Sequence, residues 1–395
     1  MIECDVLVIG GGPAGSSAAR ATASKGKKTI FIDKKEKIGH PVQCAEGIGK
    51  YLFPLLPFKI PKDQLKWKID GMYFWIDGVT IECVGGFWEG YTIDREKFEN
   101  WLAKRAVDKG AKLWENTKLI RFDFDNKGNI KKAIVEKAGE EFEIKARAII
   151  GADGSESTVL QQLGLFNPGK GDIGEIYSWE MKSLSITKPS FEQIFIGDFT
   201  PGGYAYIFPK SKNTANIGVG GLLPRKKMEK YFYEFLEIPQ VKKQVKNAKF
   251  VIEKSKKSIW SDIIDKWIYK NVILAGDAAN QNLKPFVEGI LPAIICGDIA
   301  GKLSSKYSNF DSKISKSYTN QIENIFKDSY FNSKIYTKLI KELFLSNAPA
   351  QNLLFGGLLI GVFEPKDIKK LQDFEYDYIL SLLKSKIQYI QSRNI

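Results

Sequence analysis

The chain has 395 residues, of which 44% are hydrophobic and 27% charged; this excludes a disordered protein and allows two or three domains with substantial cores. Its formal net charge of +13 indicates attraction to anionic small molecules or a membrane surface, unless it serves solubility alone, and no nucleic-acid-binding module is recognisable. Four dispersed cysteines and a single histidine, His40, exclude the usual zinc, iron–sulfur and histidine-based catalytic sites, so we expect no metal.

The first predicted element is a strand–turn–helix–strand unit over about residues 3–33. Its first strand ends in Gly10-x-Gly12-x-x-Gly15, where the glycines allow a tight turn, close approach of a pyrophosphate and close helix packing. The helix N-terminus adds amide N–H groups and the positive end of a dipole. The second strand ends at Asp33, whose carboxylate is placed to bind the ribose hydroxyls of an adenosine. We therefore predict a dinucleotide site that includes Gly10, Gly12, Ala14, Gly15, Asp33 and Lys34.

A loop over residues 39–47 leads into short segments rich in aromatic residues. Residues 72–75 and 79–83 have the alternating pattern of strands and are predicted to belong to a separate sheet. Asp94 is predicted to cap the N-terminus of a helix that begins at about residue 95. A buried strand over 146–151 then returns the chain to the first sheet.

From about residue 172 to 260 the sequence again has β patterns separated by Gly and Pro turns, and residues 301–395 have a helical pattern. A buried strand and the start of a helix lie between these regions. We expect an α/β fold, more closely described as a two-domain α+β protein with an antiparallel second sheet. The predicted parts are a dinucleotide-binding domain (1–60, 91–171 and 261–300), a substrate-binding β-sheet domain (61–90 and 172–260) and a C-terminal helical region (301–395).

Two later motifs, Asp153-Gly154 and Gly276-Asp277, each follow a short hydrophobic strand. Together with the N-terminal turn they resemble the glutathione-reductase-type FAD-binding fold, with its Rossmann-like domain. More narrowly, the chain resembles the geranylgeranyl reductase branch of the aromatic-hydroxylase-like flavoproteins over about residues 1–300. This resemblance implies that the cofactor is FAD.

The resemblance also assigns roles around the cofactor. It implies that Asp277 binds the ribityl chain or the pyrophosphate region, that Arg95 lies against the cofactor, and that the backbone of Leu119 meets the adenine. A helix that opens at Gly289 and Ile290 would direct its positive end toward the flavin.

Residues 41–47 are placed like the cysteine-containing loop of the family, which lies beside the isoalloxazine ring. The resemblance therefore assigns Cys44, Ala45 and Gly47 to the cofactor site. A cysteine thiol is largely protonated at neutral pH, so Cys44 either donates or relays a proton during catalysis or acts as a small buried side chain. For Glu46 the alternatives are that it holds a water molecule or tunes this thiol, or that it is solvated as loop carboxylates usually are; we expect the last.

A second part of the resemblance concerns the substrate. Tyr204-x-Tyr206-x-Phe208, followed by Gly218-x-Gly220, is similar to the aromatic and glycine signature on the substrate sheet of the family, although Tyr206 stands where Trp is more usual. Aromatic faces stabilise developing positive charge on a substrate by cation–π attraction. The alternative is that these side chains simply fill a core.

The family reduces prenyl C=C bonds by hydride transfer from flavin N5 combined with protonation. The implied substrates are geranylgeranyl chains of archaeal-type membrane ether lipids or geranylgeranyl diphosphate. An FAD-dependent aromatic hydroxylase of the same fold, using NAD(P)H and oxygen, is the main alternative, and a non-catalytic prenyl-binding protein is a further one. The electron donor is expected to be a ferredoxin-like protein or NAD(P)H.

The sequence contains no run of about 18 apolar residues, so any membrane contact is expected to be peripheral. The chain enters a strand directly, without a signal peptide, and we expect a cytoplasmic protein that meets the anionic inner face of the cell membrane. Residues 353–363 are apolar and rich in glycine. They either line a tunnel mouth or dip into the membrane, or they form part of a buried helix pair.

Overall fold

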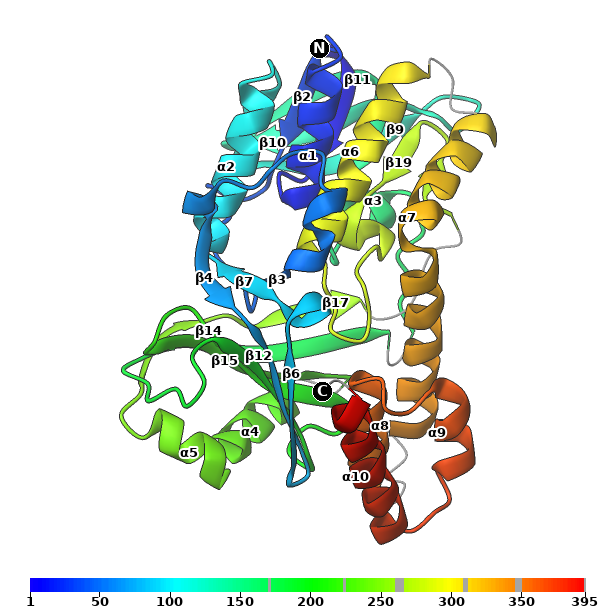
Figure 1. Ribbon diagram of the computed structural model, residues 1–395. Coiled ribbons are helices and arrows are strands. Elements are labelled where there is room, and N and C mark those ends of the chain that lie inside the picture. The colour runs from blue at the N-terminus through cyan, green and yellow to red at the C-terminus, as the bar shows by residue number, and fades with distance from the viewer. Residues whose placement is uncertain (170–171, 223–224, 260–265, 308–311, 345–349, 394–395) are drawn as a thin grey trace.

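The glycine-rich turn follows β1, a central strand of the first sheet (Figure 1). The computed structural model describes residues 1–169, 172–222, 225–259, 266–307, 312–344 and 350–393. β1 (Ile2–Ile9) pairs in parallel with β2 (Thr29–Ile32) and with β11 (Glu140–Gly151). The sheet order is β18-β19-β11-β1-β2-β8, where the outer strands are β8 (Lys112–Trp114), β19 (Val272–Leu274) and β18 (Ile268–Tyr269). β10 (Ile130–Lys137) extends it by antiparallel pairing with β11, and β9 (Thr117–Phe124) pairs in turn with β10.

Small residues let two helices pack very closely against this sheet. A methyl group on Gly297 of α6 (Ile290–Lys306) would lie 2.1 Å from the carbonyl oxygen of Ala14 in α1 (Pro13–Ala23), so only glycine fits there. A third helix, α2 (Arg95–Val107), begins as predicted, because the Asp94 side chain accepts a hydrogen bond from the Lys97 amide at 3.2 Å. These helices bring the turn, Arg95 and the start of α6 to one end of the sheet.

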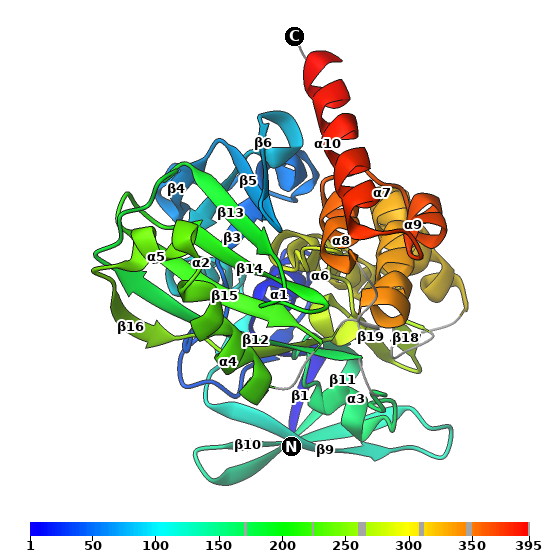
Figure 2. The ribbon, with the colours of Figure 1, turned by 90° about the horizontal axis from the view of Figure 1, so that it is seen from below.

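The second sheet has the order β16-β12-β15-β14-β13-β5-β6 (Figure 2). Its strands are β5 (Gly71–Ile76), β6 (Val79–Val84), β12 (Ile173–Lys182), β13 (Phe191–Ile196), β14 (Gly203–Pro209), β15 (Thr214–Gly221) and β16 (Lys249–Glu253). β17 (Lys256–Ile259) pairs with β12 beside this path. α4 (Arg225–Leu236) and α5 (Pro239–Val245) cover one face, where alternate side chains such as Phe195 and Ile207 are fully buried. The other face contributes to a cavity and to the core under the C-terminal helices.

A small sheet of β3 (Gly47–Gly49), β7 (Gly90–Ile93) and β4 (Leu65–Ile69) lies between the two large sheets (Figure 1). Short 3₁₀ segments accompany it: η1 (Lys50–Leu55), η2 (Lys62–Gln64) and η3 (Gly86–Trp88). The cysteine-containing loop enters this sheet through β3. The predicted domain boundaries at 171 and 260 lie outside the described residues, so the proposed division into domains stays a prediction.

The C-terminal region consists of helices that pack beside the second sheet (Figures 1 and 2). They are α7 (Ser312–Leu339), a π-helical turn (Ile340–Phe344), α8 (Gln351–Leu359), α9 (Pro365–Leu371) and α10 (Tyr376–Arg393). The apolar segment 353–363 is mainly α8, and Leu354 is only 2% exposed. A methyl group on Gly356 would lie 2.5 Å from the Ile76 side chain of β5, so this segment packs inside the protein and does not dip into a membrane. Within the described residues, no helix combines the length and apolar character needed to cross a bilayer.

Candidate functional site

A cavity of about 400 Å³ runs from the glycine-rich turn to the second sheet. Separate elements supply its lining: the turn after β1, the loop before β3, the first turn of α2, strand β14 and the segment after β19. Most predicted site residues line it, namely Gly10, Gly12, Ala14, Asp33, Lys34, Cys44, Ala45, Gly47, Arg95, Leu119, Tyr204, Tyr206, Phe208, Gly220, Asp277, Gly289 and Ile290. Gly15 and Gly218 are not part of the lining and lie behind it. The structure therefore brings the two predicted sites, for cofactor and for substrate, into one continuous space.

The glycine-rich turn has the geometry of a phosphate cradle. Gly10 has a φ of +102°, and a methyl group on Gly15 would lie 1.7 Å from the Gly10 carbonyl oxygen, which explains both glycines. The Cβ position of Gly12 has no atom within 4 Å, so this residue borders open space in the cavity. α1 begins there without a side-chain cap, which leaves its first amide groups available to an anion. This arrangement fits the pyrophosphate of FAD.

Asp33, which directly follows β2, stabilises the same turn by hydrogen bonds. Its Oδ2 accepts a hydrogen bond from the Gly11 amide at 2.7 Å, and its Oδ1 accepts one from the Lys35 amide at 2.9 Å. The carboxylate also lines the cavity, where a ribose would meet it. Binding of an adenosine ribose by Asp33 stays a prediction.

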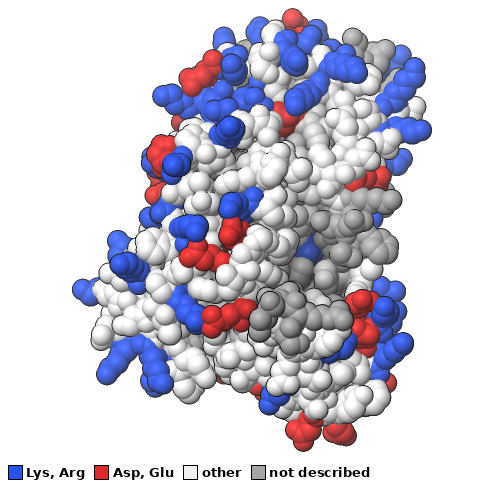
Figure 3. Space-filling model, viewed as in Figure 1, with Lys and Arg blue, Asp and Glu red and all other residues white. Residues whose placement is uncertain are grey.

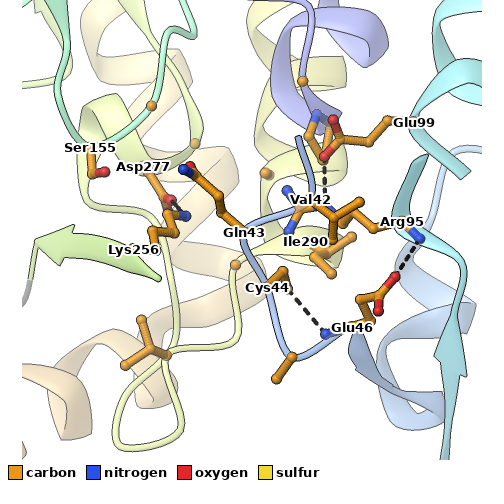
Figure 4. Close-up of a pocket in the computed structure, with 18 of the residues that line it drawn as sticks. Val42, Gln43, Cys44, Glu46, Arg95, Glu99, Ser155, Lys256, Asp277 and Ile290 are labelled. Atoms are coloured by element: carbon orange, nitrogen blue, oxygen red, sulfur yellow. Dashed lines mark hydrogen bonds and ion pairs between the residues drawn. The ribbon is translucent and has the colours of Figure 1, made fainter. Parts of the chain in front are cut away.

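Arg95 and Cys44 meet at the centre of the cavity (Figure 4). The Arg95 Nε donates to Glu99 Oε1 at 2.5 Å, and the Cys44 sulfur accepts a hydrogen bond from the Glu46 amide at 3.2 Å. Although burial alone would lower the pKa of Arg95, the Glu99 carboxylate outweighs it and Cys44 adds to the effect, so this pKa is raised. The guanidinium is thus a fixed positive charge beside the thiol.

Asp277 lies on the opposite side of the same space, next to Lys256 (Figure 4). The two side chains are 3.3 Å apart, and Asn282 Nδ2 donates to Asp277 Oδ1 at 3.2 Å. Burial raises the pKa of Asp277, but Lys256 and these hydrogen bonds outweigh it and keep the pKa below its ordinary value. The carboxylate is therefore ionised. The N-terminus of α6, at Gly289 and Ile290, borders this region without a side-chain cap.

Glu46 corrects an expectation, because this carboxylate is buried at 1% exposure and not solvated. It accepts hydrogen bonds from Lys210 Nζ at 2.5 Å, Lys254 Nζ at 2.7 Å and Asn216 Nδ2 at 2.8 Å. Its Oε1 also accepts from the Arg95 amide at 2.8 Å. Its lysine partners lie 164 and 208 residues away along the chain, so no local pattern could have revealed them.

Glu180 completes this buried ionic network. Its carboxylate lies 2.8 Å from Lys210 Nζ and 3.0 Å from Lys254 Nζ. Burial opposes ionisation of both Glu46 and Glu180, but the two ammonium groups outweigh it; the pKa of Glu46 is lowered, and that of Glu180 falls to about 2. The network joins the loop that carries Cys44 to the second sheet.

The half of the cavity where the sequence predicts the substrate has a floor of aromatic side chains from β14. The ring centroids of Tyr204 and Tyr206 are 6.4 Å apart, and those of Tyr206 and Phe208 are 4.9 Å apart. A methyl group on Gly218 would lie 2.6 Å from the Tyr206 hydroxyl, so this glycine makes room for the ring from behind. Tyr206 is 4% exposed, which means that the aromatic side chains both line the cavity and belong to the core.

Sequence reasoning missed two further carboxyl groups in this half, those of Glu192 and Glu288. One signal was available for Glu192. It alternates with Ile194 and Ile196 in β13, so it had to share the face of these buried apolar side chains. Glu288 lies in an irregular segment, where no such pattern exists.

We expect Gly12→Val to leave the folded chain intact while removing the cofactor. The Cβ position has no atom within 4 Å, so the new side chain starts in open space and occupies the region in front of the α1 N-terminus. Affinity for FAD should fall at least about ten-fold, or ~1.4 kcal/mol. Titration of flavin-free protein with FAD measures this, and matching thermal unfolding of the two flavin-free proteins is the control. Unchanged affinity would contradict the assigned cradle.

We expect the network around Glu180 to govern stability in acid. A carboxylate whose pKa is lowered on folding stabilises the folded state above its unfolded pKa, and this contribution is lost as the pH falls through its folded value. For Glu180 the window extends from 4.5 down to about 2. Glu180→Gln should therefore lose less unfolding free energy than the wild type between pH 5 and pH 3, as measured by urea unfolding. Parallel pH profiles for the two proteins would contradict the ionic assignment.

Known proteins resemble this chain in both sequence and structure. Residues 5–68 and 78–283 each match a family described as an FAD binding domain. The chain is 34% identical to digeranylgeranylglycerophospholipid reductase of Methanococcus aeolicus, over 83% of this chain and 83% of that protein. It is 32% identical to the protein of the same name from Methanocaldococcus jannaschii, over 93% of this chain and 94% of that one. A geranylgeranyl bacteriochlorophyll reductase-like protein from Thermoplasma acidophilum has the same fold, with a TM-score of 0.80 at 24% identity, covering 94% of this chain and 99% of that chain.

These matches confirm the predicted fold class and the predicted cofactor, FAD. They also agree with the narrower resemblance that the Cys44 loop and the aromatic signature of β14 indicated. With both FAD-binding regions present and this identity extending over most of its length, the chain belongs to the digeranylgeranylglycerophospholipid reductase family of flavoproteins.

Proposed function

We propose that this protein saturates C=C double bonds in the geranylgeranyl chains of archaeal-type membrane ether lipids. The observation that carries the proposal is the single cavity in which a dinucleotide cradle continues into an apolar, aromatic-lined half. The names of the relatives support a lipid of this class. Geranylgeranyl diphosphate is the alternative substrate, and it shares the same reacting chain.

Bound FAD supplies a hydride equivalent from its reduced ring. The chain's own residues hold it in place. We propose that the turn at Gly12 and the α1 N-terminus bind the pyrophosphate, and that Asp33 binds the adenosine ribose. The remaining contacts proposed for FAD are Ala14, Lys34, Cys44, Ala45, Gly47, Arg95, Leu119, Asp277, Gly289 and Ile290.

On the substrate side, the residues have a different task. An isolated alkene has no carbonyl group to polarise, so positive charge develops on carbon when protonation leads. The faces of Tyr204 and Tyr206 would stabilise that charge by about 1–2 kcal/mol each when water is excluded. Tyr204 is held in position because its hydroxyl donates to the Phe286 carbonyl oxygen at 3.0 Å. Phe208 and Gly220 complete the proposed substrate pocket, with Gly218 supporting Tyr206 from behind.

The rival functions receive less support. An aromatic hydroxylase would share the fold and the FAD, but the relatives at 32–34% identity are named reductases. A non-catalytic prenyl-binding protein would need neither FAD-binding region, yet both are present. For the electron donor we propose a ferredoxin-like protein or NAD(P)H.

We also propose peripheral contact with an anionic membrane surface. The buried segment 353–363 cannot make this contact, whereas apolar side chains near the cavity do reach the surface. Phe87, which lines the cavity, is 50% exposed, and Leu55 and Val84 are 44% and 67% exposed. Lysine and arginine side chains gather at the top of the face in Figure 3 and are scattered along its edges, in agreement with the net charge of +13.

Anaerobic turnover tests the proposed reaction. Dithionite-reduced enzyme incubated with a digeranylgeranyl lipid should add about 2 Da for each double bond saturated, as measured by mass spectrometry. Oxidised enzyme without a reductant is the control and should leave the mass unchanged. Strict dependence on oxygen, with oxygen added to an aromatic substrate, would instead favour the hydroxylase. Replacing dithionite by reduced ferredoxin or by NAD(P)H identifies the donor.

Vesicle flotation tests the membrane contact. Phe87→Asp should bind several-fold less well to anionic vesicles than the wild type, because it places a charge where an apolar side chain would enter the interface. Phe124→Asp is the matched control, since Phe124 is 46% exposed on β9 of the first sheet. Equal binding of all three proteins would argue against a contact at Phe87.

A further inference from the structure

Two carboxyl groups lie against β3 in the apolar half of the cavity. A methyl group on Gly47 would lie 2.4 Å from Glu192 Oε1, and one on Gly49 would lie 3.5 Å from Glu288 Oε2. β3 directly follows the loop that carries Cys44. The two carboxyl groups therefore line the space between the cofactor half and the aromatic floor.

Glu192 has an unusual environment for a carboxyl group. Among the described residues it makes no hydrogen bond or ion pair, whereas Glu46 and Asp277 are both paired with lysines. Its neighbours include apolar side chains: Met72 is its partner on the adjacent strand β5, and Phe208 Cε2 lies 3.2 Å from the same methyl position on Gly47. An ionised carboxylate without a partner is unfavourable in such surroundings, which favour the neutral acid.

The titratable groups around Glu192 act in the same direction. Burial, followed by the charge of Glu288, raises the pKa of Glu192 to about 8. Tyr204 on β14 lies close to Glu192. The pKa of Tyr204 is raised by burial first, then by Tyr206 and by Glu192. At neutral pH Glu192 thus carries a proton within the space that a prenyl chain would occupy.

Glu288 is held in place by the distant Tyr51 and by the backbone of its own segment. The Tyr51 hydroxyl donates a hydrogen bond to Glu288 Oε2 at 2.8 Å, and Leu283 and Glu288 form an isolated antiparallel bridge. The preceding residue, Val287, has a φ of +57°, which is strained for a β-branched side chain. Backbone strain of this kind persists where surrounding contacts hold a side chain in a required position.

We propose that Glu192 is the catalytic acid of this enzyme and that Glu288 is a positioning residue that keeps it protonated. The proposal rests on the proposed reduction of a prenyl chain. In the step, the O–H bond of Glu192 breaks and a C–H bond forms at one alkene carbon. FAD, when bound and reduced, would supply the hydride equivalent for the second C–H bond, so that the alkene would gain two electrons and the cofactor would be oxidised. The Glu192 carboxylate regains a proton from solvent, and the electron donor reduces FAD again.

Cys44 is another candidate acid in this cavity, on the side proposed for FAD. Its sulfur accepts a hydrogen bond from the Glu46 amide and lies beside the Arg95 guanidinium. Cys44 therefore serves as an acceptor in its local contacts, on the side of the cavity assigned to FAD. Glu192 lies on the side of the aromatic floor, where protonation of the substrate is needed.

The experiment compares Glu192→Gln with a matched Glu82→Gln control in the holoenzyme. Glu82 lies on β6 of the same sheet and forms a surface ion pair with Lys188 at 2.9 Å. Glu192→Gln should reduce the rate of lipid saturation about 100-fold or more, the usual contribution of a general acid. Glu192→Asp, which keeps an acid, should recover part of the rate. Glu82→Gln should match the wild type, and all proteins should retain FAD.

Two further readouts separate an acid from a merely structural residue. The wild-type rate should fall as the pH rises through about 8, the pKa at which Glu192 loses its proton. Glu288→Gln removes a like charge, lowers the pKa of Glu192 and should move this decline to lower pH. Infrared difference spectra should show a carboxylic acid C=O band that titrates near the same pH in the wild type and is absent from Glu192→Gln.

The outcomes are distinct. A Glu192→Gln enzyme with the wild-type rate, or a titrating band that persists in it, overturns the acid assignment. So does loss of saturation only in Cys44→Ser. If the wild-type enzyme itself adds no hydrogen to the lipid under reducing conditions, the proposed function fails, and the acid assignment fails with it. If lipid saturation is seen and Glu192→Gln alone loses it, the acid assignment stands.

Discussion

The arrangement of the cavity depends on the burial of one carboxylate, that of Glu46. Taking an ion out of water costs several kcal/mol, so a buried charge persists only where partners satisfy it. Glu46 has two ammonium groups, an amide group and a backbone N–H within hydrogen-bond distance. These partners come from α2 and from the second sheet, so the loop is connected to both sides of the cavity at once.

The contacts of Glu46 also restrain Cys44, because Cys44 lies two residues before Glu46 in the same loop. Glu46 has a φ of +70°, a strained conformation for a side chain other than glycine, and its amide donates to the Cys44 sulfur. The ionic network keeps this geometry in place. A buried ionic network contributes little net stability compared with an apolar core, but it permits few alternative arrangements. We interpret it as a device that determines where the loop lies between cofactor and substrate.

Charged groups have different surroundings in the two halves of the cavity. Near the proposed FAD site, two charged groups have opposite partners: Arg95 pairs with Glu99, and Asp277 with Lys256. Such pairs stay ionised and provide fixed charges around an anionic cofactor. In the apolar half, Glu192 has no such partner among the described residues, and burial favours its neutral form. One cavity can thus hold a charged cofactor and an uncharged lipid chain.

Local patterns in the sequence were sufficient for much of the fold and for most of the cofactor site. The turn at Gly10–Gly15, the acid at Asp33 and the cap at Asp94 are all local, because each depends on neighbours within one supersecondary unit. The aromatic signature around Tyr206 also predicted residues of the cavity. Sequence alone did not decide whether residues 353–363 were buried, since the same apolar composition suits a core and a membrane surface equally.

Tertiary structure decided the electrostatics. Glu46 was expected to be solvated because loop carboxylates usually are, but its partners Lys210 and Lys254 lie just after the ends of the distant strands β14 and β16. Glu192 and Glu288 are 96 residues apart (288 − 192), and only the folded chain brings both against β3. Sequence by itself therefore determined the family, the cofactor and the elements that bind it, because these depend on local backbone geometry. The protonation states within the cavity depend on burial and on long-range pairs, and those exist only once the two sheets have come together.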